Sequence, residues 1–318
     1  MKAISFEDIR EAGIEPAQCM EWVADSIKSK SKAILPAKIS LHPDDKGTFC
    51  NFMPCIVPDS NGGLWGGVKV VTRYPGRRPA LDSKLLLFDA HSGEMLALMD
   101  ADWITAMRTG AVAAHSIELF AKTGFSEISI MGLGNTGRAT LLMLEEVAGE
   151  KDLNVKLLRY KGQEELFVNR FAGFENLHFS FTDSYEDLAK GADVIVSAVT
   201  YLPDDICSDQ CFQEGVLVVP VHTRGFTNCD LFFDKVFADD TAHVSNFKNF
   251  ARFNSFSEVS DVVNGRAKGR ESDRERILAY NIGIAMHDVV FAARIYQALD
   301  KGRLQEIELK QPIDKFWV

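Results

Sequence analysis

The sequence predicts an α/β protein in which a doubly wound parallel sheet accompanies a smaller α+β domain. From Ile128 onward, strand-like segments alternate with helix-like segments, and this alternation is typical of a parallel sheet covered by helices on both faces. Before Asp102, several strand-like segments follow one another between turn sequences, which indicates a largely antiparallel meander. A chain of 318 residues is long enough for two domains with separate cores.

Composition and charge exclude several classes of protein. The formal net charge is -10 and the basic residues are dispersed, so we expect no nucleic-acid partner. The first residues lack a basic region followed by an apolar run, and we expect a soluble, cytoplasmic protein with no membrane partner. The six cysteines show neither Cys-x-x-Cys pairs nor the histidine spacing of a zinc site, so we expect no metal.

The elements of the first domain follow from local patterns. Apolar residues recur at helical spacing between Met20 and Ile27, which predicts an amphipathic helix. The strand-like segments after it are AKISLHP, TFCNFMPCIV, LWGGVKVVTRYP, SKLLLFDA and EMLALMDA. Asp102 is then a candidate N-cap, and the residues after it predict a long helix that Gly124 closes.

The alternating region begins with the strand EISIMGLG and the helix NTGRATLLMLEEVAG. It continues with the strand NVKLLRY, the short helix SYEDLAKG and the strands DVIVSAV and GVLVVPV. Near the C-terminus, residues 277–299 predict one further long helix.

Gly132, Gly134 and Gly137 form a Gly-x-Gly-x-x-Gly turn between a predicted strand and a predicted helix. The first glycine permits a tight turn, the second lets the backbone approach a pyrophosphate, and the third lets the helix pack on the strand. Asn135 and Thr136 then lie at the helix N-terminus, which favours phosphate. The motif in this context predicts a Rossmann-type dinucleotide domain; an ordinary strand-to-helix turn is the alternative.

The end of the second strand of this domain predicts NADP(H) in preference to NAD(H). NAD-binding domains carry an acidic residue there that accepts hydrogen bonds from the ribose 2'-hydroxyl. Here the strand ends at Arg159, and no Asp or Glu occurs before Glu164. Arg159 and Lys161 can pair with a 2'-phosphate, and Arg138 in the turn can assist them. An Arg159 that is simply exposed, with NAD(H) as the cofactor, is the alternative.

Two cations stand out in the first domain. Lys69 interrupts a strand of small and β-branched residues, where a charged side chain needs a partner because burying an unpaired ammonium is costly. It can bind a substrate carboxylate or act as an acid near a reacting nitrogen, or it can face water from an edge strand. Arg108 lies early in an alanine-rich helix, where its planar group can hold a carboxylate or simply face solvent.

Four segments carry a resemblance to a known family. They are GGVKVV, LLLFDAHSGEMLALMDADWITAMRTGAVAA, IMGLGNTGRA and NIGIAMHD, in this order and at this spacing. The chain resembles the ornithine cyclodeaminase and mu-crystallin family over nearly its whole length. The resemblance implies that the nucleotide domain, residues 122–284, is inserted in a substrate-binding and dimerisation domain formed by residues 1–121 and 285–318. It also implies a homodimer through the N-terminal sheet.

The resemblance also implies roles for single residues. Lys69 matches the family lysine that contacts the substrate carboxylate or the reacting nitrogen, and Arg108, followed by Thr109, matches the arginine that holds the substrate carboxylate. Lys38 takes the place of an upstream arginine that many members carry, and a lysine there lacks the bidentate fork. We therefore expect a substrate site that includes Lys38, Met53, Lys69 and Arg108. For the cofactor site we expect the residues of the turn and the strand end with Arg108, Thr109 and Asn281.

One departure from the family bears on the reaction. Family cyclodeaminases carry an aspartate after the strand that is VLVVPV here, and this chain has Arg224 in or beside that position. Asp230 lies too far along to replace it. Arg224 is a candidate selector for a second acidic group on the substrate, and His222 is a further candidate acid because the pKa of histidine lies near neutrality.

The hypothesis from sequence is therefore an NADP(H)-dependent oxidoreductase of the ketimine reductase or amino-acid dehydrogenase type. It would interconvert a small α-amino acid and its α-imino or α-keto acid, with Lys69 as the acid. Two alternatives stay open. One is ornithine cyclodeaminase, which converts L-ornithine to L-proline with a recycled hydride. The other is a protein that, like mu-crystallin, binds NADPH or a small ligand.

Overall fold

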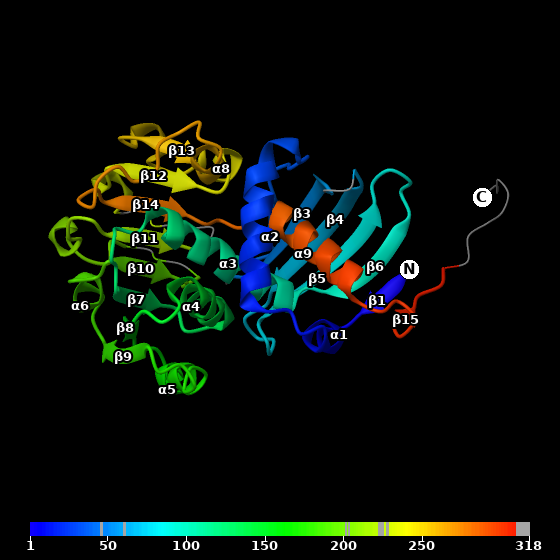
Figure 1. Ribbon diagram of the computed structural model, residues 1–318, viewed down its shortest axis with the longest axis horizontal. Coiled ribbons are helices and arrows are strands. Elements are labelled where there is room, and N and C mark those ends of the chain that lie inside the picture. The colour runs from blue at the N-terminus through cyan, green and yellow to red at the C-terminus, as the bar shows by residue number, and fades with distance from the viewer. Residues whose placement is uncertain are drawn as a thin grey trace.

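The structure is a computed structural model that describes residues 1–44, 47–59, 62–200, 202, 204–221, 226 and 229–309. Two sheets lie side by side, and helix α2 stands between them (Figure 1). The first sheet takes strands from both ends of the chain, whereas the second takes strands from the middle. The predicted α/β class, with a parallel Rossmann-type sheet beside a smaller α+β unit, is confirmed.

The first sheet has seven strands in the order β15-β1-β6-β5-β4-β3-β2. Neighbours from β2 to β6 are antiparallel, as the meander predicts, while β1 joins β6 in parallel. In this register Met53 on β3 lies opposite Lys69 on β4. The strands are β1 (Lys2–Ile4), β2 (Ile39–Leu41), β3 (Phe49–Pro58), β4 (Leu64–Arg73), β5 (Leu81–Asp89), β6 (Met95–Asp100) and β15 (Gln305–Glu306).

The second sheet has eight parallel strands in the order β13-β12-β14-β11-β10-β7-β8-β9. The strand order reverses between β7 and β10, which is where doubly wound sheets form a crevice for a ligand. The strands are β7 (Glu127–Met131), β8 (Leu153–Leu158), β9 (Leu177–Thr182), β10 (Val194–Ser197), β11 (Leu217–Pro220), β12 (Lys235–Ala238), β13 (Phe256–Glu258) and β14 (Ile277–Tyr280).

Helices α2 and α3 contact both units, and α9 packs on the first sheet and on these two helices. Helix α9 lies across the face of the first sheet and contacts β3, β4 and β5, while α3 packs against α4 of the second unit (Figure 1). Gly110 makes the α3–α4 contact close, because a Cβ there would lie 2.4 Å from the Ala139 carbonyl carbon. The helices are α1 (Phe6–Glu11), α2 (Pro16–Ser29), α3 (Asp102–Phe120), α4 (Asn135–Ala148), α5 (Gln163–Asn169), α6 (Tyr185–Ala189), α7 (Thr241–Val244), α8 (Val259–Val263) and α9 (Ala285–Ala298).

The ends of α3 differ from the sequence prediction. The N-cap is Ala101, and Asp102 is the first helical residue. The carboxylate that accepts at this end belongs to Asp100, whose Oδ1 lies 3.0 Å from the Asp102 backbone nitrogen. The helix also ends at Phe120, before Gly124, because Ala121 turns to extended backbone.

The predicted helix over residues 277–299 was wrong in its first part. Ile277–Tyr280 form strand β14, which lies buried between β11 and β12, and α9 begins only at Ala285. A short apolar run suits a buried parallel strand as well as a helix, so its periodicity cannot separate the two. Gly283, at a φ of +82°, interrupts the segment in the left-handed region that favours glycine.

No helix in the part of the chain that the structure describes is long and apolar enough to cross a membrane.

Candidate active site

The buried charge of Lys69 is explained by the helix that covers its strand. Alternation along β4 turns Lys69 toward α9, and its side chain is 0% exposed. Gly67 on the same face lets the helix approach, because a Cβ there would lie 2.8 Å from a methyl group of Val289. This close packing brings Asp288 of α9 to Lys69.

Asp288 joins the two predicted cations. Its Oδ1 accepts from Lys69 Nζ at 2.6 Å and from Arg108 Nε at 2.8 Å. Lys69 Nζ also donates to Thr105 Oγ1 at 3.2 Å. The other oxygen of Asp288, Oδ2, is buried and has no hydrogen-bond partner among the described residues. We call Lys69, Arg108 and Asp288 the buried triad.

Burial shifts the pKa values of the buried triad. Burial lowers the pKa of Lys69, the nearby Arg108 acts in the same direction and Asp288 opposes both, and the net result is a pKa of about 7. Burial alone would raise the pKa of Asp288, but Arg108 and Lys69 hold it below its ordinary value. One carboxylate shared by two cations cannot compensate both fully, so Lys69 is the member of the buried triad that can lose a proton near neutral pH.

Lys38 adds a third cation beside the buried triad. Its Nζ donates to the Ile282 carbonyl at 3.2 Å. Burial lowers the pKa of Lys38 to about 8, with Arg108 acting in the same direction and Asp239 against it. The structure therefore brings together Lys38, Lys69 and Arg108, and it places Met53, 3% exposed, on the strand next to Lys69.

The glycine-rich turn has the geometry of a close backbone approach. Gly132 has a φ of +92°, and a Cβ there would lie 2.4 Å from the Ala198 carbonyl carbon, so the turn at the end of β7 touches the end of β10. A Cβ on Gly137 would lie 2.3 Å from the Gly132 oxygen. Gly134, the N-cap of α4, has no neighbour within 4 Å of such a Cβ, which leaves the helix start open to a phosphate.

Arg159 lies directly after β8, as the sequence predicts, and it has a partner that sequence reasoning missed. Its guanidinium pairs with Asp183 at 3.0 Å and lies over the Phe181 ring at 5.3 Å. The neighbouring Lys161 has a φ of 53° and lies over the Tyr160 ring. These side chains sit at the carboxyl ends of β8 and β9, where the ribose of a bound dinucleotide is expected.

The remaining predicted cofactor residues lie after β14, on α3 and in the first turns of α4. Asn281 is 1% exposed, donates from Nδ2 to Ser116 Oγ at 3.0 Å, and leaves Oδ1 without a partner among the described residues. The Thr109 hydroxyl donates to the Thr105 carbonyl at 2.6 Å. Arg138, at the start of α4, has a buried Nε to which no described residue bonds. Asn135 and Thr136 form the first turn of α4.

His222 and Arg224, the other two predicted catalytic residues, lie outside the described residues.

Sequence reasoning missed Asp288 as a functional residue. It lies 219 positions from Lys69, within the segment NIGIAMHD that was noted only for its resemblance. The available signal was an acidic side chain within an otherwise apolar helix face, because a buried charge needs a partner. Lys69 and Arg108, two cations without a carboxylate in their own segments, also indicated that an acidic partner lies elsewhere in the chain.

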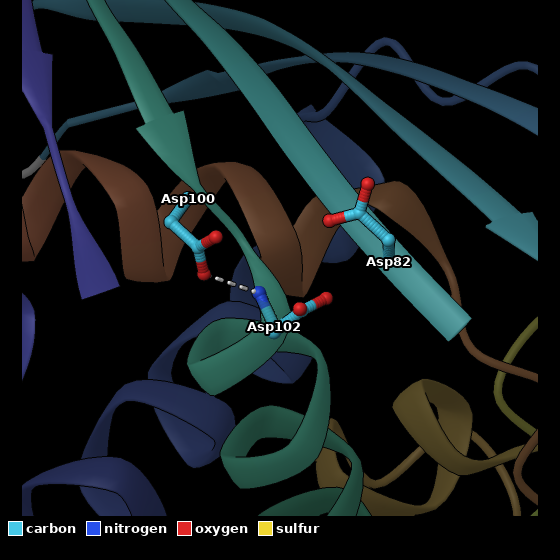
Figure 2. Close-up of side chains that lie close together, drawn as sticks. All are labelled: Asp82, Asp100 and Asp102. Carbon is cyan, nitrogen blue, oxygen red and sulfur yellow. Dashed lines mark hydrogen bonds between the residues drawn. The ribbon is translucent and has the colours of Figure 1, made fainter. Parts of the chain in front are cut away.

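A separate group of carboxylates lies at the start of α3. Asp82 of β5, Asp100 of β6 and Asp102 face a common space, and Asp100 accepts from the backbone nitrogen of Asp102 (Figure 2). Lys84 already supplies a cation, because its Nζ pairs with both Asp82 and Asp100. We assign no ligand to this group.

Comparisons with known proteins identify the family of the chain and relatives that share its fold. The model of the ornithine cyclodeaminase/mu-crystallin family matches residues 5–303. The nodulation efficiency protein NfeD of Rhizobium meliloti is 27% identical over 284 residues, which are 84% of each chain. A Delta(1)-pyrroline-2-carboxylate reductase of Bacillus cereus is 25% identical over 320 residues, which cover 92% of this chain and 95% of the relative.

A solved structure has the same fold. The Delta(1)-pyrroline-2-carboxylate reductase of Thermococcus litoralis, in complex with NADH and L-proline, matches with a TM-score of 0.83 at 22% identity. The match covers 96% of this chain and all of the other.

Proposed function

Because the chain belongs to the ornithine cyclodeaminase/mu-crystallin family, we propose that it is an NADP(H)-dependent oxidoreductase acting on the C–N bond of a small α-amino or α-imino acid. The observation that carries the proposal is the buried triad, in which Asp288 holds Lys69 and Arg108 side by side. A relative of similar length reduces a cyclic imino acid according to its name, and a solved neighbour holds L-proline with NADH. The reductase hypothesis is therefore preferred to cyclodeamination of L-ornithine.

The residues of the buried triad suit different parts of an imino acid. Arg108 donates to Asp288 only through Nε, and no described residue accepts from its Nη1 or Nη2. The terminal nitrogens can therefore form a bidentate pair with the substrate carboxylate. Lys38 can add a single charged hydrogen bond to the same group. Carboxylate binding at these cations places the imine of the substrate near Lys69.

Lys69 would supply the proton. Reduction of an imine adds a hydride to the carbon and a proton to the nitrogen, and a pKa of about 7 allows Lys69 to give up a proton near neutral pH. Asp288 would keep the ammonium group oriented before transfer. In the reverse direction the neutral amine would accept a proton from the substrate nitrogen.

The nicotinamide cofactor, which supplies or receives the hydride, fits the residues at the carboxyl ends of the second sheet. Gly132, Gly134 and the start of α4 would cradle the pyrophosphate, because no side chain fills the space at Gly134. Arg159 and Lys161 would hold a 2'-phosphate, which favours NADP(H) over NAD(H). Asn281 would contact the nicotinamide end through its free Oδ1.

We further propose the domain division expected from the sequence, with residues 122–284 as the nucleotide domain. The remaining residues, 1–121 and 285–318, would bind substrate and form a homodimer in the cytoplasm. Support for a dimer comes from β2, an edge strand whose Ile39 and Leu41 are 58% and 52% exposed. Apolar side chains on an edge strand favour pairing with another chain.

One assay tests the function. The purified protein is incubated with NADPH and a panel of cyclic and acyclic imino acids, the latter formed from an α-keto acid and ammonia or methylamine. NADPH consumption in proportion to amino acid formed is the expected result. Ammonia and proline formed from L-ornithine without net cofactor turnover would instead make the protein a cyclodeaminase.

A further inference from the structure

The segment between β14 and α9 contacts both cations that are proposed to bind the substrate carboxylate. Lys38 Nζ donates to the Ile282 carbonyl at 3.2 Å. The Arg108 guanidinium lies against Gly283, because a Cβ on this glycine would lie 2.7 Å from Nη1 and 3.2 Å from Nη2. Residues 282 and 283, which we call the 282–283 segment, therefore touch the charged ends of Lys38 and Arg108.

The 282–283 segment also relates the two cations to each other. Asp288 accepts from Arg108 through Nε. Lys38 Nζ has a single acceptor among the described residues, the Ile282 carbonyl. An ammonium group has three donors, so two remain for a substrate, as do the terminal nitrogens of Arg108. A shift of the 282–283 segment would therefore change the spacing of the groups that are free to bind a carboxylate.

Asp239 holds the 282–283 segment. It follows β12 directly and is 5% exposed. Its Oδ2 accepts the Gly283 backbone N–H at 2.8 Å, and its own backbone N–H donates to the Tyr280 carbonyl at 3.1 Å. Gly283 is buried and lies outside the helices and strands, where a backbone N–H needs an acceptor from another group. Asp239 supplies this acceptor.

The main chain of Lys38 is tied to the same end of β12. Its backbone nitrogen lies 3.4 Å from His243 Nε2, and His243 Nδ1 lies 2.7 Å from Asp240 Oδ2. Burial alone would raise the pKa of Asp240, but hydrogen bonds from His243 and Lys30 lower it to about 2. The ionised carboxylate only accepts, so the imidazole proton lies on Nδ1, and Nε2 accepts from Lys38. The second unit therefore holds Lys38 at its main chain and at its ammonium group.

From these contacts we propose that Asp239 is a positioning residue for substrate binding, which accepts from Gly283 and thereby sets the spacing of Lys38 and Arg108 around the substrate carboxylate. The role in binding rests on the proposed function, whereas the contact with Gly283 does not. The proposal requires an acceptor oxygen and no charge. Burial raises the pKa of Asp239, and an amide oxygen accepts from a backbone N–H as a carboxyl oxygen does. Asparagine should therefore replace Asp239.

The kinetic test compares two substitutions at this position. Asp239→Ala removes the acceptor, so the KM for an imino acid should rise by about tenfold, while kcat and the Kd for NADPH change little. Asp239→Asn keeps the acceptor and should restore a KM close to that of the unmodified protein. An unchanged KM in Asp239→Ala, or equal KM values in the two variants, would overturn the proposal. If Asp239→Ala does not fold, Asp239→Leu fills the same space without an acceptor and should give the same result.

Asp193 provides a matched control. It is also 5% exposed, and its Oδ2 accepts the Ser126 backbone N–H at 2.9 Å. It precedes β10, whereas Asp239 follows β12, so the two carboxylates lie at opposite edges of the parallel sheet. Asp193→Ala should lower the free energy of unfolding and leave the KM for the imino acid unchanged. An equal rise in KM would assign the effect of Asp239→Ala to general loss of stability and contradict the proposal.

An exchange measurement separates this inference from the proposed function. Hydrogen exchange of the Gly283 amide is followed by NMR in the ¹⁵N-labelled full chain without substrate or cofactor. The amide should exchange faster in Asp239→Ala than in Asp239→Asn or the unmodified protein, because its acceptor is lost. Equal exchange in all three would contradict the contact itself. Faster exchange in a protein that reduces no imino acid would reject the proposed function, and with it the role in binding, but would keep the contact.

Discussion

The two ends of the proposed site hold similar charges in different ways. At the substrate end Arg108 and Lys69 share Asp288, and the exposed fractions of these side chains are 6%, 0% and 0%. At the ribose end Arg159 pairs with Asp183, and their side chains are 46% and 76% exposed. A buried pair that loses one partner leaves a charge without compensation, whereas an exposed pair contributes little. The same type of contact therefore fixes geometry at one end and leaves the other end adjustable.

Removal of the shared carboxylate should have the largest effect. Asp288→Asn leaves Lys69 and Arg108 buried without an anion, so we expect the free energy of unfolding to fall by about 3–5 kcal/mol. Activity should fall as well, because the orientation of Lys69 is lost. Denaturant unfolding and kcat/KM measure both. The matched control Asp82→Asn, in the half-buried carboxylate group at the start of α3, should change each only slightly; equal effects of the two variants would contradict the comparison.

Removal of the proposed proton donor should affect the reaction and leave cofactor binding intact. Lys69→Met should lower kcat for imine reduction by roughly 10²–10⁴-fold, the usual contribution of a positioned general acid. The Kd for NADPH, followed by fluorescence, should stay nearly constant because Lys69 lies in the first sheet. Turnover close to that of the unmodified protein would remove Lys69 from the mechanism.

The lowered pKa of Lys69 predicts a pH dependence of stability. In the folded protein its pKa is about 7, whereas an unfolded chain has a value near about 10.4. Between these values the unfolded state binds one more proton, so this group makes the folded state more stable as pH rises, by at most about 1.4 kcal/mol per pH unit. The difference in unfolding free energy between the unmodified protein and Lys69→Met should therefore rise from pH 7 to pH 9. A difference that stays constant would contradict the lowered pKa.

A substitution at the ribose end should change the cofactor preference rather than the free energy of unfolding. Arg159→Asp should shift the preference from NADPH toward NADH by about tenfold or more, as expected for about 1.4 kcal/mol. Its effect on unfolding should stay within about 1 kcal/mol because the Asp183 pair is exposed. An unchanged ratio of kcat/KM for the two cofactors would show that the 2'-position is recognised elsewhere.

The smallest expected effect comes from removing Asp183 at the ribose end. It tests whether the Arg159–Asp183 ion pair competes with binding of the cofactor. Asp183→Asn frees Arg159 from its carboxylate, so NADPH should bind up to a few-fold more tightly, with a stability change below about 1 kcal/mol. Weaker NADPH binding would show that Asp183 orients Arg159 for the phosphate. The Kd values of NADPH and NADH, measured at one fixed salt concentration, decide between the two.

Local patterns predicted the parts of the molecule that depend on neighbouring residues. The turn at Gly132, its position after a strand, and the cation at Arg159 each follow from a few consecutive positions. Lys69 and Arg108 stood out because charges in apolar segments need partners. Their common partner could not be found this way, because Asp288 is brought to them by the packing of α9 on β4, which Gly67 permits.

The errors have the same origin. Ile277–Tyr280 form a strand because they pair with both β11 and β12. The four residues alone do not indicate that these two strands are available as partners. At the start of α3 the accepting carboxylate is that of Asp100 and not that of Asp102. The strand before the helix places the Asp100 carboxylate near the backbone N–H of Asp102. In both cases the local sequence allowed two structures equally, and tertiary contacts determined which one forms.

The most direct test of the central claim follows the hydride itself. The protein is incubated with NADPH that carries deuterium on the transferred position of C4, together with an imino acid that it reduces. Mass spectrometry of the amino acid should find one deuterium at the α-carbon, and this label should appear far more slowly with Asp288→Asn. A product without deuterium, or labelled at the same rate by the variant, would contradict a reductase site built on Lys69, Arg108 and Asp288.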